Sequence, residues 1–132
     1  MRNRTIYVTK DDAERLRKLL ETSKIFYDQD RNDLQELEAE LEQGNVVEPG
    51  DIPRDIVVMN SKVRLLDLDT DEELVYRLTF PEDTDIDQDK ISVLAPVGAA
   101  MLGRRIGEVI EGKIPAGLCK LKVEAIIHQP EF

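Results

Sequence analysis

The chain is poor in the side chains that most often carry chemistry: it has one cysteine, one histidine and no tryptophan. A lone cysteine, Cys119, excludes an internal disulfide and is typical of a reducing cytosol. With only one additional soft ligand, His128, a zinc site of the usual composition is disfavoured. Neither residue has a neighbour that would make it a nucleophile or a general base, so we interpret both as structural residues of strands.

Long hydrophobic runs are also missing. No run approaches the ~18 apolar residues of a membrane helix, and the N-terminus MRNRTIYVTKDD lacks the apolar region of a signal peptide. We therefore expect a soluble cytoplasmic protein that does not contact membranes. Basic residues are few, since 18 Lys and Arg against 28 Asp and Glu give a formal net charge of -10. Such a surface repels phosphates, so no direct nucleic-acid binding is expected; basic proteins or a divalent metal are better partners.

The first third of the chain has the spacing of two helices. Thr9 is the expected N-cap of the first helix, with Asp12 at capping-box spacing, and Gly44 is the expected C-cap of the second. Apolar residues recur at spacings of three and four: Ala13, Leu16 and Leu20 in the first helix, and Leu34, Leu37 and Leu41 in the second. These stripes predict a short antiparallel helical hairpin, a coiled coil over residues 1–48, with arms only ~18 Å long.

The remainder, residues 49–132, has the period of strands. The segment NVVEPGDIPRD predicts a hinge, because Pro49, Gly50 and Pro53 stop helices. Strands are predicted in DIVVMNS, KVRLLDLD, LVYRLTF and KISVLA, followed by a closing hairpin of VIEGKIP and LCKLKVEAIIHQ. A change of phase in KVRLLDLD predicts a bulge or a strand covered on both faces. The fold class is therefore α+β: a helical hairpin, then a mostly antiparallel sheet with one short helix. Core candidates in this part are Leu74, Tyr76, Leu78, Phe80, Leu118, Leu121, Val123 and Ile126.

The stretch VLAPVGAAMLGRRIGE contains that short helix, from about Pro96 to Gly103. It matches neither G-x-x-x-x-G-K-[ST] nor G-x-G-x-x-G, so it does not predict a phosphate site. Pro96 suits the first turn of a helix, and Gly103 suits its end. Two interpretations stay open. The stretch is simply a helix packed on the sheet, or its docking corner, defined as Leu94, Ala95, Pro96 and Val97, is an exposed apolar surface that binds a partner.

Acidic residues gather in three places. Asp28, Asp30 and Asp33 lie at or just after the predicted tip of the hairpin, and the other acids cluster in DLDTDEE and EDTDIDQD. The last two segments resemble fragments of an EF-hand loop, but both the glycine at the bend and the closing glutamate are missing. Solvated turn acids are the simpler interpretation, and we expect neither a bound metal nor a cofactor.

The order of these segments resembles the Gre family of transcript-cleavage factors and, within that superfamily, the Rnk-type regulators named for nucleoside diphosphate kinase. The segments MNSKVRLLDLDT, YRLTFP and ISVLAPVGAAMLGRRIGE carry the resemblance, which covers nearly the whole second half. It implies an FKBP-like C-terminal domain that is not a working prolyl isomerase, consistent with the small number of aromatic residues. It also implies docking on RNA polymerase, at the rim helices beside the secondary channel, through the loop that corresponds here to Leu94, Ala95 and Pro96.

In the Gre family, two carboxylates at the tip of the coiled coil help hold the second catalytic Mg²⁺ of the polymerase. Here the hairpin is much shorter and lacks the D-x-S-E-N-like tip motif. We therefore expect a monomeric, non-enzymatic regulator that binds RNA polymerase and competes with cleavage factors, with any effect on nucleoside diphosphate kinase exerted through transcription. The alternative, a genuine cleavage factor that acts through Asp28, Asp30 and Asp33, stays open.

Overall fold

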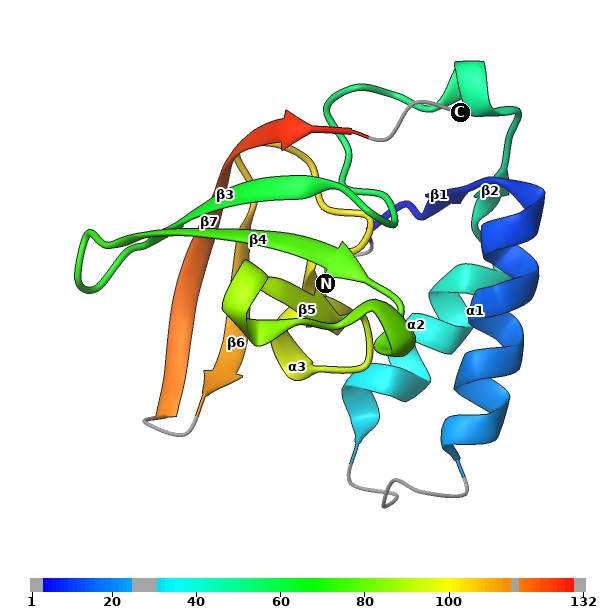
Figure 1. Cartoon of the computed structure of the whole chain (residues 1–132), viewed down its shortest axis with the longest axis horizontal. Helices are drawn as coiled ribbons and strands as arrows, with labels where there is room; N and C mark the ends of the chain where they lie inside the picture. The colour runs from blue at the N-terminus through cyan, green and yellow to red at the C-terminus, as the bar shows by residue number, and fades with distance from the viewer. Residues whose placement is uncertain (1–3, 25–30, 115–116, 130–132) are drawn as a thin grey trace.

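Two helices beside a curled five-stranded sheet form most of the structure, a computed structural model that describes residues 4–24, 31–114 and 117–129 (Figure 1). Helix α1 (Lys10–Ser23) and helix α2 (Asn32–Glu42) run antiparallel on one side, with α2 nearer the sheet. The short helix α3 (Pro96–Met101) lies between the hairpin and the sheet. The predicted α+β class and the helical hairpin are confirmed.

The helix boundaries follow local signals. Thr9 is the N-cap of α1, and its hydroxyl oxygen accepts a hydrogen bond from the Asp12 backbone N–H at 3.3 Å. All six residues of the two apolar stripes are buried, as predicted. They do not pack only against each other, however, because they share one hydrophobic cluster with buried residues of the sheet and α3. The expected pairing of stripe against stripe is therefore incomplete: the apolar faces of the two arms also belong to the core that contains the sheet and α3.

The segment predicted as a hinge contains regular secondary structure. Strand β2 (Asn45–Val46) pairs in parallel with β1 (Tyr7–Val8), and the 3₁₀ turn η1 (Pro49–Asp51) follows it. Gly44 permits this pairing, because a Cβ there would lie 2.9 Å from the Ile6 carbonyl oxygen. The small two-stranded sheet closes the base of the hairpin. No sequence signal predicted it, since two-residue strands carry no period.

The main sheet has the strand order β5-β4-β3-β7-β6. Its strands are β3 (Lys62–Asp67), β4 (Glu73–Thr79), β5 (Lys90–Ser92), β6 (Val109–Ile114) and β7 (Gly117–His128). All neighbours are antiparallel except β4 and β5, which are parallel, and two 3₁₀ turns, η2 (Pro81–Asp83) and η3 (Ile86–Gln88), connect them. The irregularity predicted in KVRLLDLD is present as register shifts between β3 and β7, although it lies earlier in the strand than expected.

One predicted strand is wrong. DIVVMNS forms an isolated bridge between Ile56 and Arg105 and then a turn, with Asn60 at φ 68°. Its apolar residues are fully buried nonetheless: Ile56, Val57, Val58 and Met59. A short continuous apolar run fits any deeply buried segment, so periodicity could not separate this one from a strand.

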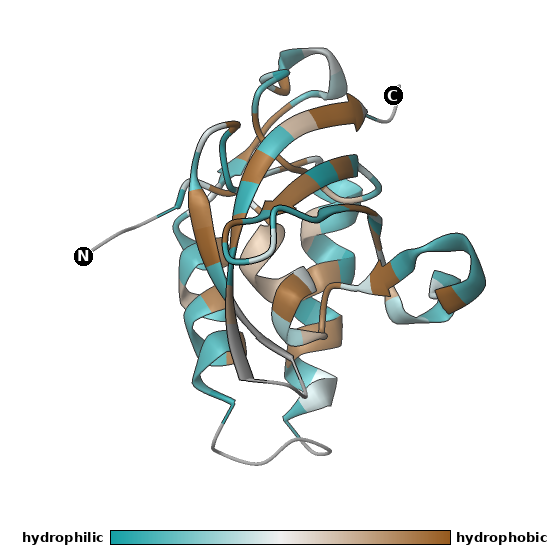
Figure 2. Cartoon of the chain, turned by 90° about the vertical axis from the view of Figure 1, so that its left-hand side faces the viewer, coloured by the Kyte–Doolittle hydropathy of each residue, from teal (hydrophilic) through white to brown (hydrophobic). Residues whose placement is uncertain are grey.

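The alternation predicted for the other strands is correct. Leu78 and Phe80 are buried, and Leu74 and Tyr76 pack against the same cluster. On β7, Leu121 and Val123 are buried and Ile126 packs against them, whereas the side chain of Leu118 lies outside the described residues. Figure 2 shows hydrophobic and hydrophilic residues alternating along the strands, as a sheet with one covered face requires. Within the described ranges, no helix is long and apolar enough to span a membrane.

Candidate functional site

The docking corner lies where β5 ends and α3 begins. Ser92, the last residue of β5, fixes the turn with both of its oxygens. Its side-chain Oγ accepts a hydrogen bond from the Leu94 N–H at 3.0 Å, and its carbonyl accepts one from the Ala95 N–H at 3.0 Å. Pro96 then begins α3 without leaving a donor unpaired. The corner is therefore a rigid turn rather than a loose loop.

The four residues of the corner differ in exposure. Pro96 is exposed, and Ala95 and Val97 are half-buried. Leu94 is only 8% exposed and belongs to the main hydrophobic cluster, so the expectation that its side chain is open to a partner is wrong. The tight turn at Ser92 directs Leu94 into the core directly after the buried Val93. The surface available to a partner is thus centred on Pro96, and Leu94 supports it from beneath.

Arg31 connects the helical hairpin to this corner. Its Nη2 donates to the Leu94 carbonyl oxygen at 2.7 Å. Its Nε and Nη2 each lie 2.9 Å from a carboxylate oxygen of Asp33, in a two-point contact. The start of α2 and the docking corner are consequently neighbours in space, although 63 residues separate Arg31 from Leu94 in the chain.

Asp33 is therefore already engaged within the protein. Partial burial alone would raise the pKa of its carboxyl, but the hydrogen bonds and the charge of Arg31 outweigh burial and hold the pKa below its ordinary value. The carboxylate is ionised at neutral pH, with both oxygens directed at one guanidinium. The other two predicted tip acids, Asp28 and Asp30, lie outside the described residues.

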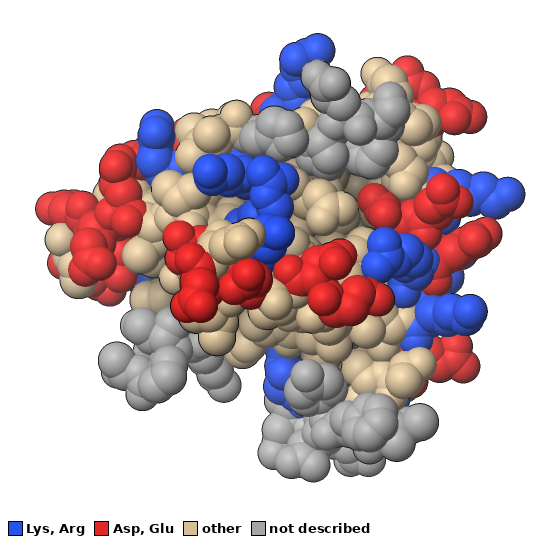
Figure 3. All heavy atoms as spheres, in the orientation of Figure 1, with Lys and Arg blue, Asp and Glu red and all other residues tan. Residues whose placement is uncertain are grey.

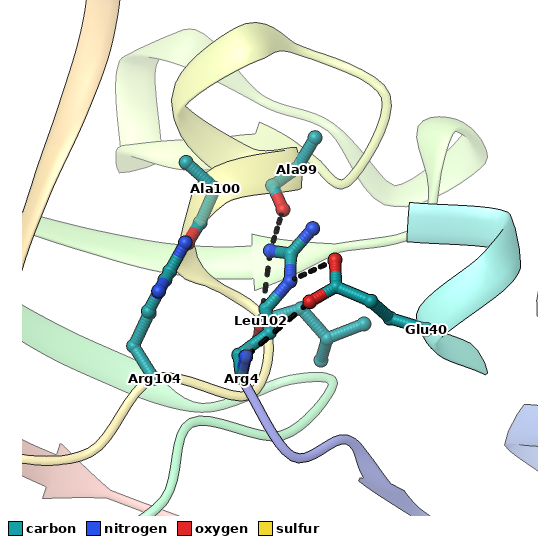
Figure 4. Close-up of polar contacts among 6 residues, drawn as sticks. All are labelled: Arg4, Glu40, Ala99, Ala100, Leu102 and Arg104. Carbon is teal, nitrogen blue, oxygen red and sulfur yellow. Dashed lines mark hydrogen bonds and ion pairs between the residues drawn. The ribbon is translucent and has the colours of Figure 1, made fainter. Parts of the chain in front are cut away.

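A second arginine ties the N-terminal segment to α3 (Figure 4). The Arg4 side chain is buried; its Nε lies 2.9 Å from Glu40 Oε1 on α2, and its backbone N–H donates to Glu40 Oε2 at 3.3 Å. Its Nη1 donates to the carbonyl oxygens of Ala99 and, at 3.1 Å, Leu102. Three segments distant in sequence thus meet at one guanidinium, toward the end of α3. Arg104, also buried, donates from Nε to the Ala100 carbonyl at 3.0 Å.

Contacts on α1 fix the other arm of the hairpin. The Arg15 guanidinium lies over the ring of Phe80, 3.8 Å from its centroid, and Arg15 Nη2 is 3.3 Å from Glu82 Oε1. Phe80 follows the last residue of β4 and is only 2% exposed. Arg15 therefore connects α1 to the segment that follows β4, as Arg31 connects the start of α2 to the docking corner.

The remaining candidates are structural. In the acidic loops, Asp67 Oδ1 accepts a hydrogen bond from the Asp69 N–H at 2.9 Å, and Asp85 Oδ1 accepts one from the Asp87 N–H at 3.1 Å, so both acids shape turns. Among the described residues, no three His, Cys, Asp or Glu side chains are grouped so that they could hold a metal ion. Cys119 is buried in the main cluster.

Arg4 and Arg31 were not found from the sequence, because the contacts that join them to α3 and to the docking corner are with backbone carbonyls far along the chain. No local pattern marks such contacts.

Comparison with known proteins identifies the family. The model "Rnk N-terminus" matches residues 4–47, and "Transcription elongation factor, GreA/GreB, C-term" matches residues 52–128. The chain is 38% identical over 96 residues to the regulator of nucleoside diphosphate kinase of Escherichia coli K12, and the match covers 72% of the chain and 71% of that protein. The chain is a Rnk-type member of the GreA/GreB superfamily.

Other proteins similar to the Rnk-type chain are transcription elongation factors. It is 40% identical over 83 residues to the transcription elongation factor GreA of Thermodesulfovibrio yellowstonii. The match covers 63% of the chain and 52% of that factor. The chain thus spans about half the length of this relative. A solved GreA/GreB structure from Nitrosomonas europaea has a TM-score of 0.79 and 38% identity, and the match covers 94% of the Rnk-type chain and 100% of that one.

Proposed function

We propose that this protein binds RNA polymerase beside the secondary channel through its docking corner and competes there with Gre cleavage factors. The observation that carries the proposal is an exposed Pro96 on a rigid turn, supported by the buried Leu94 and bordered by the half-buried Ala95 and Val97. An apolar group held in place in the unbound protein loses little entropy on binding, so it suits a recognition anchor. The loop of the Gre family that corresponds to this corner contacts the polymerase.

We also propose the identity of the two domains, their mode of action and the cellular location. The five-stranded sheet with α3 is the FKBP-like docking domain over residues 49–132, and the hairpin over residues 1–48 is the shortened counterpart of the family's coiled coil. The domain acts by binding and not as a prolyl isomerase. The protein works in the cytoplasm as a monomer, without contacting nucleic acid itself, and it needs no cofactor of its own.

We further propose that the protein does not promote RNA cleavage. At 1.5 Å per residue, the 14 residues of α1 and the 11 residues of α2 span only ~21 and ~17 Å. The apolar stripes of both helices belong to the same core as the sheet and α3, and the start of α2 lies against the docking corner itself. Little of the arm is left to extend beyond the docking point. Asp33 is bound to Arg31, so it does not offer a free carboxylate to a metal ion.

The docking corner is tested by replacing Pro96 with serine. Serine is tolerated at the start of a helix, so the fold should be retained while the exposed apolar anchor is removed. We expect affinity for core RNA polymerase to fall about 5- to 30-fold, the equivalent of ~1–2 kcal/mol for losing an anchor at an interface. The matched control is Val46→Ser, which removes another exposed apolar residue, 51% exposed, from the base of the hairpin. Equal affinities for the wild type and Pro96→Ser would refute the docking assignment.

The cleavage question is tested on stalled elongation complexes. We expect the protein alone to release no short RNA, and an excess of it to slow the cleavage that a Gre factor stimulates. Pro96→Ser should lose this inhibition. If the protein instead releases short RNA, and Asp28→Asn with Asp30→Asn abolishes the release, then the alternative function as a cleavage factor is correct.

A further inference from the structure

Three basic side chains form a row across the exposed face of the sheet. In the strand register, Lys62 on β3 lies opposite Arg77 on β4, and Arg77 lies opposite Lys90 on β5. Residues in such positions share one face, with neighbouring strands ~5 Å apart. Like charges directly opposite each other destabilise a sheet. The fold therefore tolerates a repulsive arrangement at this position.

Arg77 is held within the protein, because its Nη1 donates to the Asn60 carbonyl oxygen at 2.6 Å, whereas the two lysines of this basic row lack an acidic partner among the described residues. The chain has 28 acidic residues, yet in the part that the structure describes, no carboxylate lies within ion-pair distance of Lys62 or Lys90. Arg64, two residues along the same face of β3, behaves differently: its Nε lies 3.8 Å from a Glu73 oxygen and 3.5 Å from a Glu124 oxygen. On one face of one sheet, an arginine with two acidic neighbours thus lies next to two lysines that have none within ion-pair distance in the described part of the chain.

The basic row also lines an open depression. Its other lining residues are Val75, Gln88, Asp89 and Ile127, and Ile127 is 49% exposed. Figure 3 shows Lys and Arg side chains gathered over β3 and β4 on this face, with acidic side chains around them. The depression thus combines positive charge with apolar surface, a mixture typical of protein interfaces.

We propose that the basic row binds an acidic, extended segment of the partner protein that docks at the corner. Charge complementarity selects the occupant: carboxylates neutralise the row, and aliphatic side chains cover Val75 and Ile127. A nucleic acid fits less well, because the Asp89 carboxylate borders the depression and the net charge is -10. Strand β5 connects the two surfaces, since Lys90 begins it and the corner follows its end. For the identity of the partner, this inference rests on the proposed function.

The test measures binding of a fluorescent eight-residue peptide of alternating glutamate and leucine at low ionic strength. The wild type should bind it, and Lys62→Gln with Lys90→Gln should weaken binding at least fivefold. The control is Lys10→Gln with Lys18→Gln, two exposed lysines of α1, which changes net charge equally and should leave the affinity unchanged. A peptide with glutamine in place of glutamate should not bind.

Equal weakening by both lysine pairs would overturn the proposal, since it would indicate attraction by charge in general. Unchanged binding by the variant at Lys62 and Lys90 would overturn it directly. Tighter binding of single-stranded RNA than of the peptide, through the same two lysines, would assign the row to nucleic acid instead. The assay contains no polymerase, so its failure is distinguishable from failure of the Pro96 experiment.

Discussion

Replacing Arg4 with alanine should lower the free energy of unfolding by about 3 kcal/mol, since breaking a buried ion pair on one side leaves an uncompensated charge. Glu40 would keep a carboxylate whose side chain is only 21% exposed, without the guanidinium that neutralises it. The Ala99 and Leu102 carbonyls at the end of α3 would lose a donor at the same time. Urea unfolding followed by circular dichroism measures the change.

A double variant separates the charge from the packing. Arg4→Met with Glu40→Leu removes both charges and retains apolar volume, so it should cost less than Arg4→Ala alone. If Arg4→Ala costs less than about 1 kcal/mol, then the network is not the principal connection between the N-terminal segment and α3. A change in the slope of the unfolding free energy against urea concentration would indicate that the substitution changes the compactness of the unfolded or the native state.

Gly98→Ala should destabilise the protein by about 3 kcal/mol, at the upper end of the range for overpacking. A Cβ at position 98 would lie 2.0 Å from the Ser92 carbonyl oxygen and 3.2 Å from the Val93 Cα. Both are backbone atoms of the segment where β5 leads into the docking corner, so no side chain can rotate away to make room. Alanine is the better helix former by ~1 kcal/mol, but that gain is smaller than the cost of the clash.

The matched control for this substitution is Gly50→Ala. A Cβ at Gly50 in η1 would meet nothing within 4 Å, so the change should stay within about 0.5 kcal/mol. Thermal unfolding of the two variants beside the wild type gives the comparison. Similar melting temperatures for Gly98→Ala and the wild type would show that α3 can move away from β5, and the docking corner could not then be the rigid turn described above.

Much of the fold could be predicted because its signals are local. Three or four residues separate the leucines of each helical stripe, and every second residue from Leu74 to Phe80 faces the core. Pro96 and Gly103, the latter at φ +83°, mark the beginning and the end of α3 within eight residues. Such signals need no knowledge of what packs against them.

The candidate site was less predictable, because periodicity does not specify which hydrogen bonds its side chains form. Leu94 was expected at the surface, but the turn at Ser92 directs its side chain into the core. Asp33 was expected as a free tip acid, but its carboxylate is bound by the Arg31 guanidinium. Periodicity measures only how a residue relates to its near neighbours, so it cannot reveal a guanidinium bound to a carbonyl 63 residues away. The boundary between residues 48 and 49 stays a prediction.

The hairpin is completed by residues that the ribosome adds much later, and this has a consequence during synthesis. The groups that complete the Arg4 network, at Ala99 and Leu102, are synthesised long after α2. At ~5–20 residues per second, the 60 residues from position 42 to 102 take roughly 3–12 s to add. During that interval the nascent helices have leucine stripes whose final cover does not yet exist. This part of the chain should therefore be a target for holding chaperones at the ribosome, although it becomes one of the best-buried parts of the finished protein.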